Sequence, residues 1–304
     1  MNNVIDLFAK FSAVEVVSAD RISETDKMFC EKNQAAYEAA VTSYQELLFF
    51  WADMVSAQRE QLGERAGNSL YFEYLSTKEG AYISEKTVKE HIESLHESYI
   101  DWIAEYFEKS YHVTLDTASI YDRLMPEEPD YDADEEADAA YHEKMQTMLL
   151  RYQDILDLIF EQMDGRSFSE QALFELKTDC HDAAWNESEH TARFELRKDT
   201  IRFMREFSDY TYPRSYSALP DWSLREKMKA VMRGIGHFET GRYEQFPESI
   251  NGLLTGKSTQ DVVEFPDCSK VKQLKRFKNG NAYLKFASVT CAQEFINEYL
   301  GSVA

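Results

Sequence analysis

Glycine and proline are scarce in this sequence: its 304 residues include 11 glycines and 6 prolines. Sandwiches and barrels built only from β-strands need many tight turns, which these two residues supply, so the composition argues against an all-β fold. It favours long helices instead. The hydrophobic fraction of 43% and the aromatic fraction of 13% exceed those of disordered chains, and we expect most of the chain to fold.

Cysteines are also few, and no two of them form a CxxC pair; the four are Cys30, Cys180, Cys268 and Cys291. This spacing excludes a zinc ribbon, and so few cysteines in a long chain suit a reducing compartment. The first residues, MNNVIDLFAKF, lack the basic start of a signal peptide. The longest clearly apolar run, LLFFWA at 47–52, is far too short to span a membrane. We therefore expect a cytoplasmic protein without a membrane partner.

Positive charge is in short supply. Lys and Arg number 33 against 55 Asp and Glu, which gives a formal net charge of -22. A field of that sign repels phosphate backbones, so the composition argues against a protein that binds nucleic acid over its whole surface. It favours a basic host protein as partner, or a complex whose basic pocket normally takes nucleic acid. The sequence leaves homo-oligomer formation open.

The N-terminal part carries the periodicity of long helices. A helix is predicted over 24–62 with Ser23 as its cap, and a second begins after Ser84. A third is predicted over 137–163, and a fourth follows Ser169. The apolar stripe of the first helix comprises Tyr37, Val41, Tyr44, Leu48, Trp51 and Val55, and that of the second comprises Val88, Ile92, Leu95, Tyr99, Trp102, Ile103 and Tyr106.

The C-terminal part changes to shorter elements. ARFELR at 192–197 alternates apolar and charged residues and predicts a strand, and DVVEF at 261–265 indicates another. SLRE at 223–226 and TCAQ at 290–293 each have the spacing of a helix capping box. We predict a predominantly helical α+β fold, in which long, bundle-like helices precede a smaller α+β part that ends in a β-hairpin and a helix.

An acidic segment suggests how the chain divides: a helical domain at 1–125, a linker at 126–136, and a helical then α+β domain at 137–304. Residues 127–143 include nine acidic residues and no Lys or Arg. The favoured interpretation is a solvated linker that runs into a helix N-terminus, where acidic residues suit the dipole. The alternative is a strip that imitates a phosphate backbone, with carboxylates from Asp130, Asp132, Asp134 and Glu135.

LKRFKNGNAYLKF at 274–286 predicts a β-hairpin, in which Asn279 and Gly280 both supply the positive φ of a tight turn. The predicted buried face comprises Ala282, Leu284 and Phe286, and the predicted outer face comprises Tyr283 and Lys285. Residues 268–285 include six Lys or Arg and no acidic residue. The favoured interpretation is a charged edge strand that discourages edge-to-edge pairing. The functional alternative is a small contact with phosphate or a partner.

This closing motif resembles that of a family, domain of unknown function 4942. Its members typically end in a Phe-Lys-Asn-Gly-Asn turn, a short strand and a helix, which here correspond to 277–281, 282–286 and the helix that follows. A strand and a short helical segment precede the motif in the family, as ARFELR and REKMKAVM do here. The resemblance implies a setting on prophages and plasmids. Some members carry a methyltransferase domain after the hairpin, but this chain has no glycine-rich strand–turn–helix for that cofactor, so the activity does not carry over.

Two Glu-x-x-His patterns, Glu93 with His96 and Glu187 with His190, are the best metal candidates, because di-iron bundles use such pairs. Helical spacing places Glu93 outside the apolar stripe, and we therefore expect no bound iron or zinc.

Candidates for covalent catalysis are equally weak. Cys180 lies beside His181, but neighbouring side chains on a helix diverge by about 100°, so we expect a buried cysteine near a surface histidine. GxSxG, P-loop and GxGxxG motifs are absent. We expect no catalytic residue and no cofactor.

REFSDYTYPRSYSALPDW at 205–222 is rich in the residue types that dominate protein interfaces. Its aromatic side chains either pack back onto the body of the protein or contact a partner. We predict a partner-binding surface from this stretch and the basic hairpin; its residues are Tyr210, Tyr212, Arg214, Tyr216, Trp222, Lys275, Arg276, Lys278, Asn279, Asn281, Tyr283 and Lys285.

These features together predict a non-enzymatic phage or mobile-element protein that acts by binding another protein. The specific hypothesis is an anti-defence inhibitor that blocks a nucleic-acid-processing complex in the host cytoplasm. The alternative is a nucleic-acid-binding accessory module that uses the basic hairpin, as would suit a methyltransferase. A di-iron bundle enzyme is a distant third.

Overall fold

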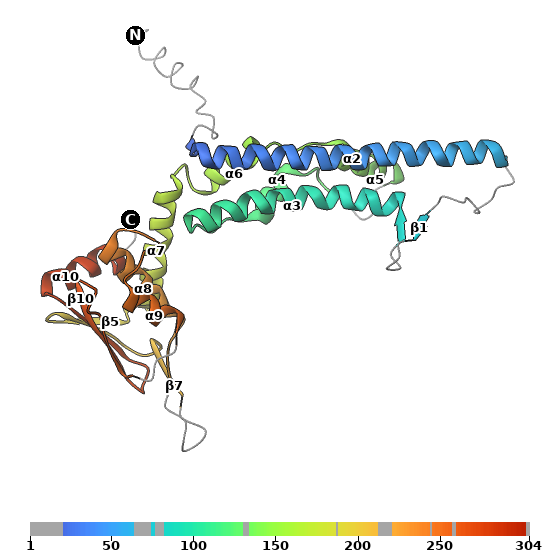
Figure 1. Ribbon diagram of the computed structural model, residues 1–304. Helices are drawn as coiled ribbons and strands as arrows, with labels where there is room; N and C mark the ends of the chain where they lie inside the picture. The colour runs from blue at the N-terminus through green and yellow to red at the C-terminus, as the bar shows by residue number, and fades with distance from the viewer. Residues whose placement is uncertain are drawn as a thin grey trace, which may run out of the picture. The chain divides into compact units, whose positions relative to one another are not determined.

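The structure is a computed structural model that describes residues 21–63, 74–76, 82–129, 134–186, 188–211, 221–243, 245–256 and 260–301. The chain divides into two units, Met1–Phe168 (unit 1) and Ser169–Ala304 (unit 2). Unit 1 is mainly helical, and unit 2 combines helices with a five-stranded sheet (Figure 1). The predicted fold class, α+β and predominantly helical, is confirmed.

Two long helices form the frame of unit 1. α2 spans Glu24–Leu62 and α3 spans Glu85–Tyr111, and the two lie side by side (Figure 1). Ser23 caps α2 and Ser84 caps α3, each by accepting a backbone N–H with its side chain. The predicted helix at 24–62 and the predicted start after Ser84 are confirmed. A short antiparallel pair, β1 (Tyr74–Ser76) and β2 (Tyr82–Ser84), precedes α3.

The apolar stripes of these helices are confirmed in part. Val41 and Trp51 on α2, and Ile92 and Ile103 on α3, are buried. Trp102 differs from the prediction, because it is 58% exposed. Adjacent helical residues point about 100° apart, so the side chain next to the fully buried Ile103 turns away from the core.

Asp26 ties the beginning of α2 to the end of α3. Its buried carboxylate accepts hydrogen bonds from the hydroxyls of Ser23 (2.6 Å), Tyr106 (2.7 Å) and Tyr111 (2.6 Å). Burial alone would raise the pKa of this carboxyl, but the hydrogen bonds from Ser23, Tyr111 and Tyr106 outweigh it and lower the pKa. The group therefore stays ionised and fixes where the two helices meet.

The third predicted helix is broken in the structure. α4 spans Thr117–Leu124, and it is followed by α5 at Glu135–Thr147 and α6 at Tyr152–Gln162. The prediction of one helix over 137–163 is wrong, because the backbone is extended between α5 and α6: ψ is 155° at Met148 and 139° at Arg151. No glycine or proline marks this break in the sequence.

A chain of hydrogen bonds through His96 holds the break together. The Met145 carbonyl can only accept, so His96 Nε2–H donates to it over 2.7 Å. His96 Nδ1 then accepts from the Tyr37 hydroxyl (2.7 Å), whose oxygen in turn accepts from the Leu150 N–H (3.2 Å). His96 is fully buried, and Tyr37 stacks on Tyr99 at 4.3 Å between ring centroids. Side chains of α2 and α3 thus supply the hydrogen bonds that the interrupted helix lacks.

The packing of α5 and α6 also decides where the chain divides. α5 packs on α3, and α6 packs on α2 and α3, so both helices belong to unit 1. The boundary predicted in the linker at 126–136 therefore lies inside unit 1, and the division between the units follows Phe168. Asp134 caps α5 by accepting the Ala137 N–H, so the last two residues of that linker already belong to a helix.

Unit 2 is organised around one antiparallel sheet with the strand order β5-β6-β11-β10-β9. Its strands are β5 (Phe194–Arg197), β6 (Thr200–Phe203), β9 (Val262–Glu264), β10 (Val271–Arg276) and β11 (Ala282–Phe286). Two further pairs are β3 (Trp185–Asn186) with β4 (Thr191–Ala192), and β7 (Ser208–Thr211) with β8 (Asp221–Leu224). The helices are α7 (Phe168–Ala184), α8 (Glu226–Thr240), α9 (Glu248–Thr255), α10 (Val289–Phe295) and a closing π-helical turn, η3 (Ile296–Leu300).

One face of this sheet carries the core of unit 2. Leu284 and Phe286 on β11 are buried together with Phe295 of α10 and Met232 of α8. The rings of Phe286 and Phe295 lie 5.7 Å apart. Lys285 is exposed, as predicted for the opposite face. The predicted strand at 192–197 is confirmed in this sheet over Phe194–Arg197, while Ala192 belongs to β4. The predicted strand at 261–265 and the predicted hairpin are also confirmed.

Both predicted capping boxes of unit 2 are wrong in detail. Ser223 lies within β8, and Arg225 precedes α8 without a side-chain cap. Thr290 lies inside α10, whose cap is Ser288 accepting the Cys291 N–H at 3.1 Å. In both cases neighbouring structure sets the helix start, β8 in the first and the end of β11 in the second. Across the part of the chain that the structure describes, no helix is long and apolar enough to cross a membrane.

The His96 network predicts a loss of stability in acid. Burial lowers the pKa of His96 below its ordinary value of 6.5, so on acidification the unfolded chain takes up this proton first. The His96 contribution is complete above about pH 6.5 and declines below it, by at most about 1.4 kcal/mol per pH unit. Urea unfolding between pH 5 and pH 8 measures this slope.

His96→Gln should be less stable at pH 7 but should lose less stability on acidification than the parent protein. His91→Gln, at an exposed position of the same helix, is the matched control and should keep the parental slope. An unchanged slope in His96→Gln would show that this imidazole does not sense pH.

Candidate functional site

The charge of the chain is divided very unevenly between the units. Unit 1 holds 14 Lys and Arg against 35 Asp and Glu, so its formal charge is 14 − 35 = −21. Unit 2 holds 19 against 20, so its formal charge is 19 − 20 = −1. The repulsion of phosphate inferred from the total of -22 therefore applies to unit 1, and unit 2 is nearly neutral.

The face of the sheet opposite the core carries polar and basic side chains. Strand pairing arranges them in two rows across the strands. The first row runs Glu195, Arg202, Tyr283 and Lys275, and the second runs Arg197, Thr200, Lys285, Gln273 and Glu264. Facing residues on neighbouring strands lie about 4.5–5.5 Å apart, so each row presents a continuous set of side chains. The carboxylates of the two rows, Glu195 and Glu264, lie on the edge strands, and Arg202, Lys275 and Lys285 lie on the strands between them.

A hollow of about 540 Å³ lies on this face. Its lining comprises Arg197, Lys198, Asp199, Thr200, Arg202, Gln273, Lys275, Tyr283 and Lys285, that is, five cations and one carboxylate. Arg197 forms an ion pair with Glu195 at 2.8 Å. Within the described part of the chain, Lys198, Arg202, Lys275 and Lys285 take part in no ion pair. Arg202 faces Glu195 across the strands, and cations still outnumber carboxylates in the lining, so the hollow is suited to an anion.

Aromatic rings lie among these cations. The Arg202 guanidinium is 4.9 Å from the centre of the Tyr283 ring, and the Phe277 ring lies 4.4 Å from the same ring at an angle of 53°. The Lys275 ammonium is 5.3 Å from the Phe277 ring. Tyr283 and Phe277 are half-buried, so both rings remain partly accessible. Sequence periodicity predicted Tyr283 on this face but missed Arg202, because only the pairing of β6 with β11 brings Arg202 beside it.

The FKNGN turn serves to hold the hairpin. Gly280 has a φ of 86°, but Asn279 does not share the positive φ predicted for both. The Gly280 N–H bonds the Phe277 carbonyl (2.9 Å) and the Phe277 N–H bonds the Asn281 carbonyl (3.0 Å), so three residues form the loop and only the last is left-handed.

The same turn is tied to the chain that enters β7. The Asn281 amide oxygen accepts the Arg205 N–H (2.8 Å), and the Gly280 carbonyl accepts the Phe207 N–H (3.0 Å). The Ser208 hydroxyl lies 3.1 Å from the Asn281 carbonyl. Asn279 and Asn281 were predicted to contact a partner, but Asn281 uses its side chain within the fold. The Asn279 side chain accepts the Asn281 N–H at 3.2 Å.

Two other predicted partner residues lie inside the protein. Arg276 is 2% exposed and Trp222 is 4% exposed, and the guanidinium lies 5.5 Å from the Trp222 ring. Arg276 also donates to the Gln260 carbonyl. Period-two alternation places Arg276 on the same face as Leu274, toward the core, so neither side chain is on the surface that the sequence predicted.

The remaining predicted partner residues fall into three groups. Tyr210 is half-buried, with its ring 4.8 Å from Trp222 and 4.4 Å from the Lys278 ammonium. Lys275, Lys278 and Lys285 are exposed. Tyr212, Arg214 and Tyr216 lie outside the described residues.

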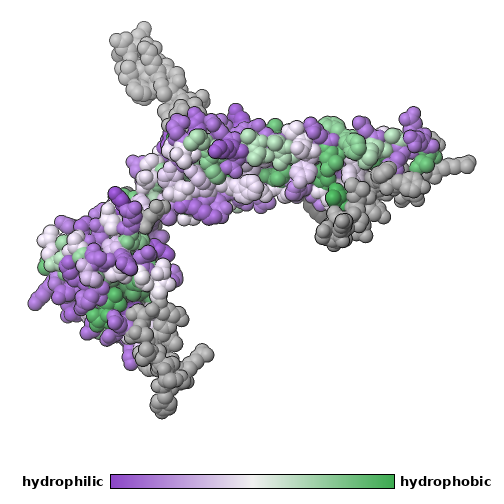
Figure 2. All heavy atoms as spheres, viewed as in Figure 1, coloured by the Kyte–Doolittle hydropathy of each residue, from purple (hydrophilic) through white to green (hydrophobic). Residues whose placement is uncertain are grey.

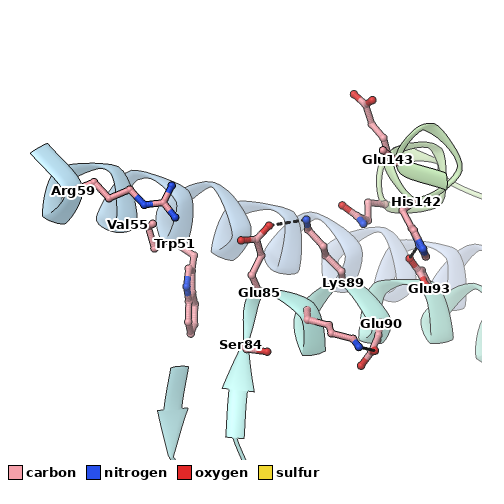
Figure 3. A pocket seen from close by; sticks show the side chains of 13 residues that line it. Trp51, Val55, Arg59, Ser84, Glu85, Lys89, Glu90, Glu93, His142 and Glu143 are labelled. Carbon is pink, nitrogen blue, oxygen red and sulfur yellow. Dashed lines mark hydrogen bonds and ion pairs between the residues drawn. The ribbon is translucent and has the colours of Figure 1, made fainter. Parts of the chain in front are cut away.

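A second hollow, of about 770 Å³, lies in unit 1 between α2, α3 and α5 (Figure 3). Its charged groups largely neutralise one another. Lys89 pairs with Glu85 at 2.6 Å, and His142 Nδ1 lies 2.9 Å from Glu93. Trp51 lines it but is 3% exposed. Charges already paired within the protein contribute little to ligand binding, so this hollow is the weaker candidate.

The metal candidates are not assembled into a site. Both ring nitrogens of His96 are used in the hydrogen-bond chain to Tyr37 and Met145, and Glu93 turns to His142 instead. Glu187 lies outside the described residues, and His190 is exposed. Among the residues described, no group of three or more His, Cys, Asp or Glu side chains is placed to hold a metal ion.

The prediction of a buried Cys180 is confirmed. Cys180 is fully buried and donates to the Ala230 carbonyl (3.3 Å), while half-buried His181 bonds the Gly301 carbonyl (2.7 Å). Burial raises the pKa of the Cys180 thiol, which opposes a nucleophilic role.

Unit 1 also exposes large apolar side chains. Phe49 is 74% exposed and Phe50 is 60% exposed, and Figure 2 shows a hydrophobic patch along the middle of α2. Their neighbour Trp51 is buried. The apolar surface of α2 is therefore wider than the part of it that packs against other described helices of unit 1.

Comparison with known proteins identifies no relative: no family model, no curated protein and no solved structure matches this chain.

Burial of Arg276 predicts that this residue contributes to stability. Arg276→Ala removes the hydrogen bond to Gln260 and the packing on Trp222, and should lower the free energy of unfolding by on the order of 1–3 kcal/mol. Lys275→Ala, its exposed neighbour on β10, should change that free energy by less than about 0.5 kcal/mol. Urea denaturation compares the two variants, and equal effects would contradict the inward position of Arg276.

Proposed function

We propose that this chain is a non-enzymatic binding module. The face of its C-terminal sheet opposite the core, which we call the open face, would hold the phosphate backbone of a nucleic acid. The observation that carries the proposal is the hollow lined by five cations, Arg202, Lys275 and Lys285 among them, and by a single carboxylate, Asp199. Lys and Arg side chains on phosphate supply most of the affinity of nucleic-acid binding that is not sequence-specific. The low formal charge of unit 2 supports the proposal, because the unit has no large excess of negative charge that would offset the attraction of a local basic surface for phosphate.

The resemblance of the closing motif to domain of unknown function 4942 supports an accessory role. Some members of that family carry a methyltransferase domain after the hairpin, and a module that holds nucleic acid would suit such an enzyme. We propose the setting of a mobile element and the cytoplasm of its host on the same resemblance.

Charge reversal on the open face tests this function. Lys275→Glu combined with Lys285→Glu should weaken binding of a fluorescein-labelled oligonucleotide by about tenfold or more at low salt. It should also reduce the slope of log affinity against log salt by about 1 for each phosphate that no longer meets a cation. Fluorescence anisotropy between about 50 and 200 mM salt measures both quantities.

The matched control reverses two charges elsewhere in unit 2, Lys229→Glu on α8 with Arg242→Glu after it. This variant has the same net charge as the first, so it should retain affinity if the open face is the binding surface. Equal losses in both variants would assign the effect to net charge, and no binding by the parent protein would remove the proposal.

A second candidate function is the binding of a basic protein by unit 1, which the balance of 14 cations against 35 acidic residues favours. α5 contributes exposed Glu136, Asp138 and Glu143 to this field. An inhibitor of a nucleic-acid-processing complex would use such a surface in place of phosphate.

Salt dependence tests the second candidate. A pull-down from the host cell at about 50 mM salt should retain a basic protein that about 500 mM salt releases, because exposed charges are screened within about 10 Å at 0.1 M and more closely above it. The variant Glu136→Gln, Asp138→Gln and Glu143→Gln should retain less of that protein. If the amount of retained protein changed neither with salt nor with these substitutions, the electrostatic basis of this candidate would be contradicted.

A further inference from the structure

The centre of the open sheet face combines cations with a ring that a nucleobase can stack on. Tyr283 lies on the middle strand β11, between Arg202 of β6 and Lys275 of β10. The Arg202 guanidinium lies over its ring at 4.9 Å, and the Phe277 ring packs against it at 4.4 Å between centroids with a tilt of 53°. A guanidinium plane and an aromatic ring both stack on bases, so Arg202 and Tyr283 together form one platform.

We propose that this platform binds single-stranded DNA, with one base stacked on the Arg202–Tyr283 pair and the flanking phosphates on the surrounding cations. The inference rests on the proposed function, and it names the substrate class of that same site. Lys198 and Lys285 lie to one side of the ring in the lining of the hollow, and Lys275 lies on the neighbouring strand. Phosphates on both sides of the stacked base thus meet a positive charge.

The position of the ring decides between single and double strands. Tyr283 projects from the middle of the sheet into the hollow, with the cations around it. In a duplex the base faces are stacked on one another, and they are closed to a ring that lies on a sheet surface. In a single strand a base can turn out and stack, which contributes affinity regardless of its sequence.

The neutral polar groups of the hollow supply no dedicated ribose site. The Thr200 hydroxyl donates to Asp199 at 3.2 Å, and the Gln273 amide donates to Glu264. The Thr200 proton and one Gln273 amide proton are thus committed within the sheet, which leaves few neutral donors for a ribose 2′-hydroxyl or a base edge. DNA, which lacks that hydroxyl, loses nothing at these positions, and we expect little sequence preference.

The edge strands limit the length of the track. Glu195 lies at the β5 end of the first row and Glu264 at the β9 end of the second, so along the first row a phosphate meets a carboxylate at β5, and along the second row it meets one at β9. The site should therefore hold only a few nucleotides, at the short end of the range of about 4–16 that single-strand-binding modules cover.

The test measures anisotropy of the full-length protein with four fluorescein-labelled probes of about 12 positions: oligo-dT, an abasic oligonucleotide of the same length, a duplex, and oligo-U. We expect affinity in the order oligo-dT, oligo-U, abasic strand, with the duplex weaker than oligo-dT. Tyr283→Leu, which leaves every charge in place, should weaken oligo-dT binding by roughly 5- to 150-fold and leave the abasic strand unchanged. Tyr283→Trp should restore oligo-dT binding, and thermal unfolding confirms that both variants are folded.

Three outcomes would overturn the inference. Stacking would be contradicted if the duplex bound as tightly as oligo-dT, or if Tyr283→Leu lost equal affinity for oligo-dT and for the abasic strand. Phosphate binding would remain supported in both cases. Oligo-U binding tighter than oligo-dT would make RNA the ligand. If no probe binds, the proposed function fails as well, so failure of the inference and failure of the function are distinguishable.

Discussion

The arrangement of unit 1 depends on the hydrogen-bond chain from the Leu150 N–H through Tyr37 and His96 to the Met145 carbonyl. It joins α2, α3 and both sides of the α5–α6 break, and each donor has one acceptor. Because its members are buried, a shift of any one helix would leave a polar group unpaired at a cost of about 1–3 kcal/mol. The network therefore fixes the position of these helices more than it adds to their general stability.

The uneven division of charge between the acidic unit 1 and the nearly neutral unit 2 underlies both proposals, a basic protein as partner for unit 1 and a nucleic acid for unit 2. A net charge describes a protein only at long range, and exposed charges are screened within about 10 Å at 0.1 M salt. A ligand close to the sheet of unit 2 has Arg202, Lys275 and Lys285 among its nearest charges. The acidic composition that argued against nucleic acid for the whole chain leaves this one surface open to it.

Local signals predicted much of the fold, and long-range contacts account for what they missed. The helix at 24–62 is bounded by Ser23 and Gly63, residues whose effect acts within one turn, and it was predicted correctly. The break before Tyr152 carries no such residue, because its hydrogen bonds come from Tyr37 and His96 on other helices.

The candidate site shows the same limit. Alternation along β11 placed Tyr283 outward, but its neighbour Arg202 follows from a strand pairing that no local pattern specifies. Alternation along β10 is enough to turn Arg276 inward with Leu274, and only its contact with Trp222 comes from another strand pair. The turn beside them has a wider consequence. Gly280 and Asn281 bond the chain that enters β7, so selection on these residues acts through folding. The side chains on the open face can change without disturbing those bonds. Similarity in this turn therefore reports first on the folding of the sheet, and it extends to the molecule that the sheet holds only where the side chains of the open face are shared as well.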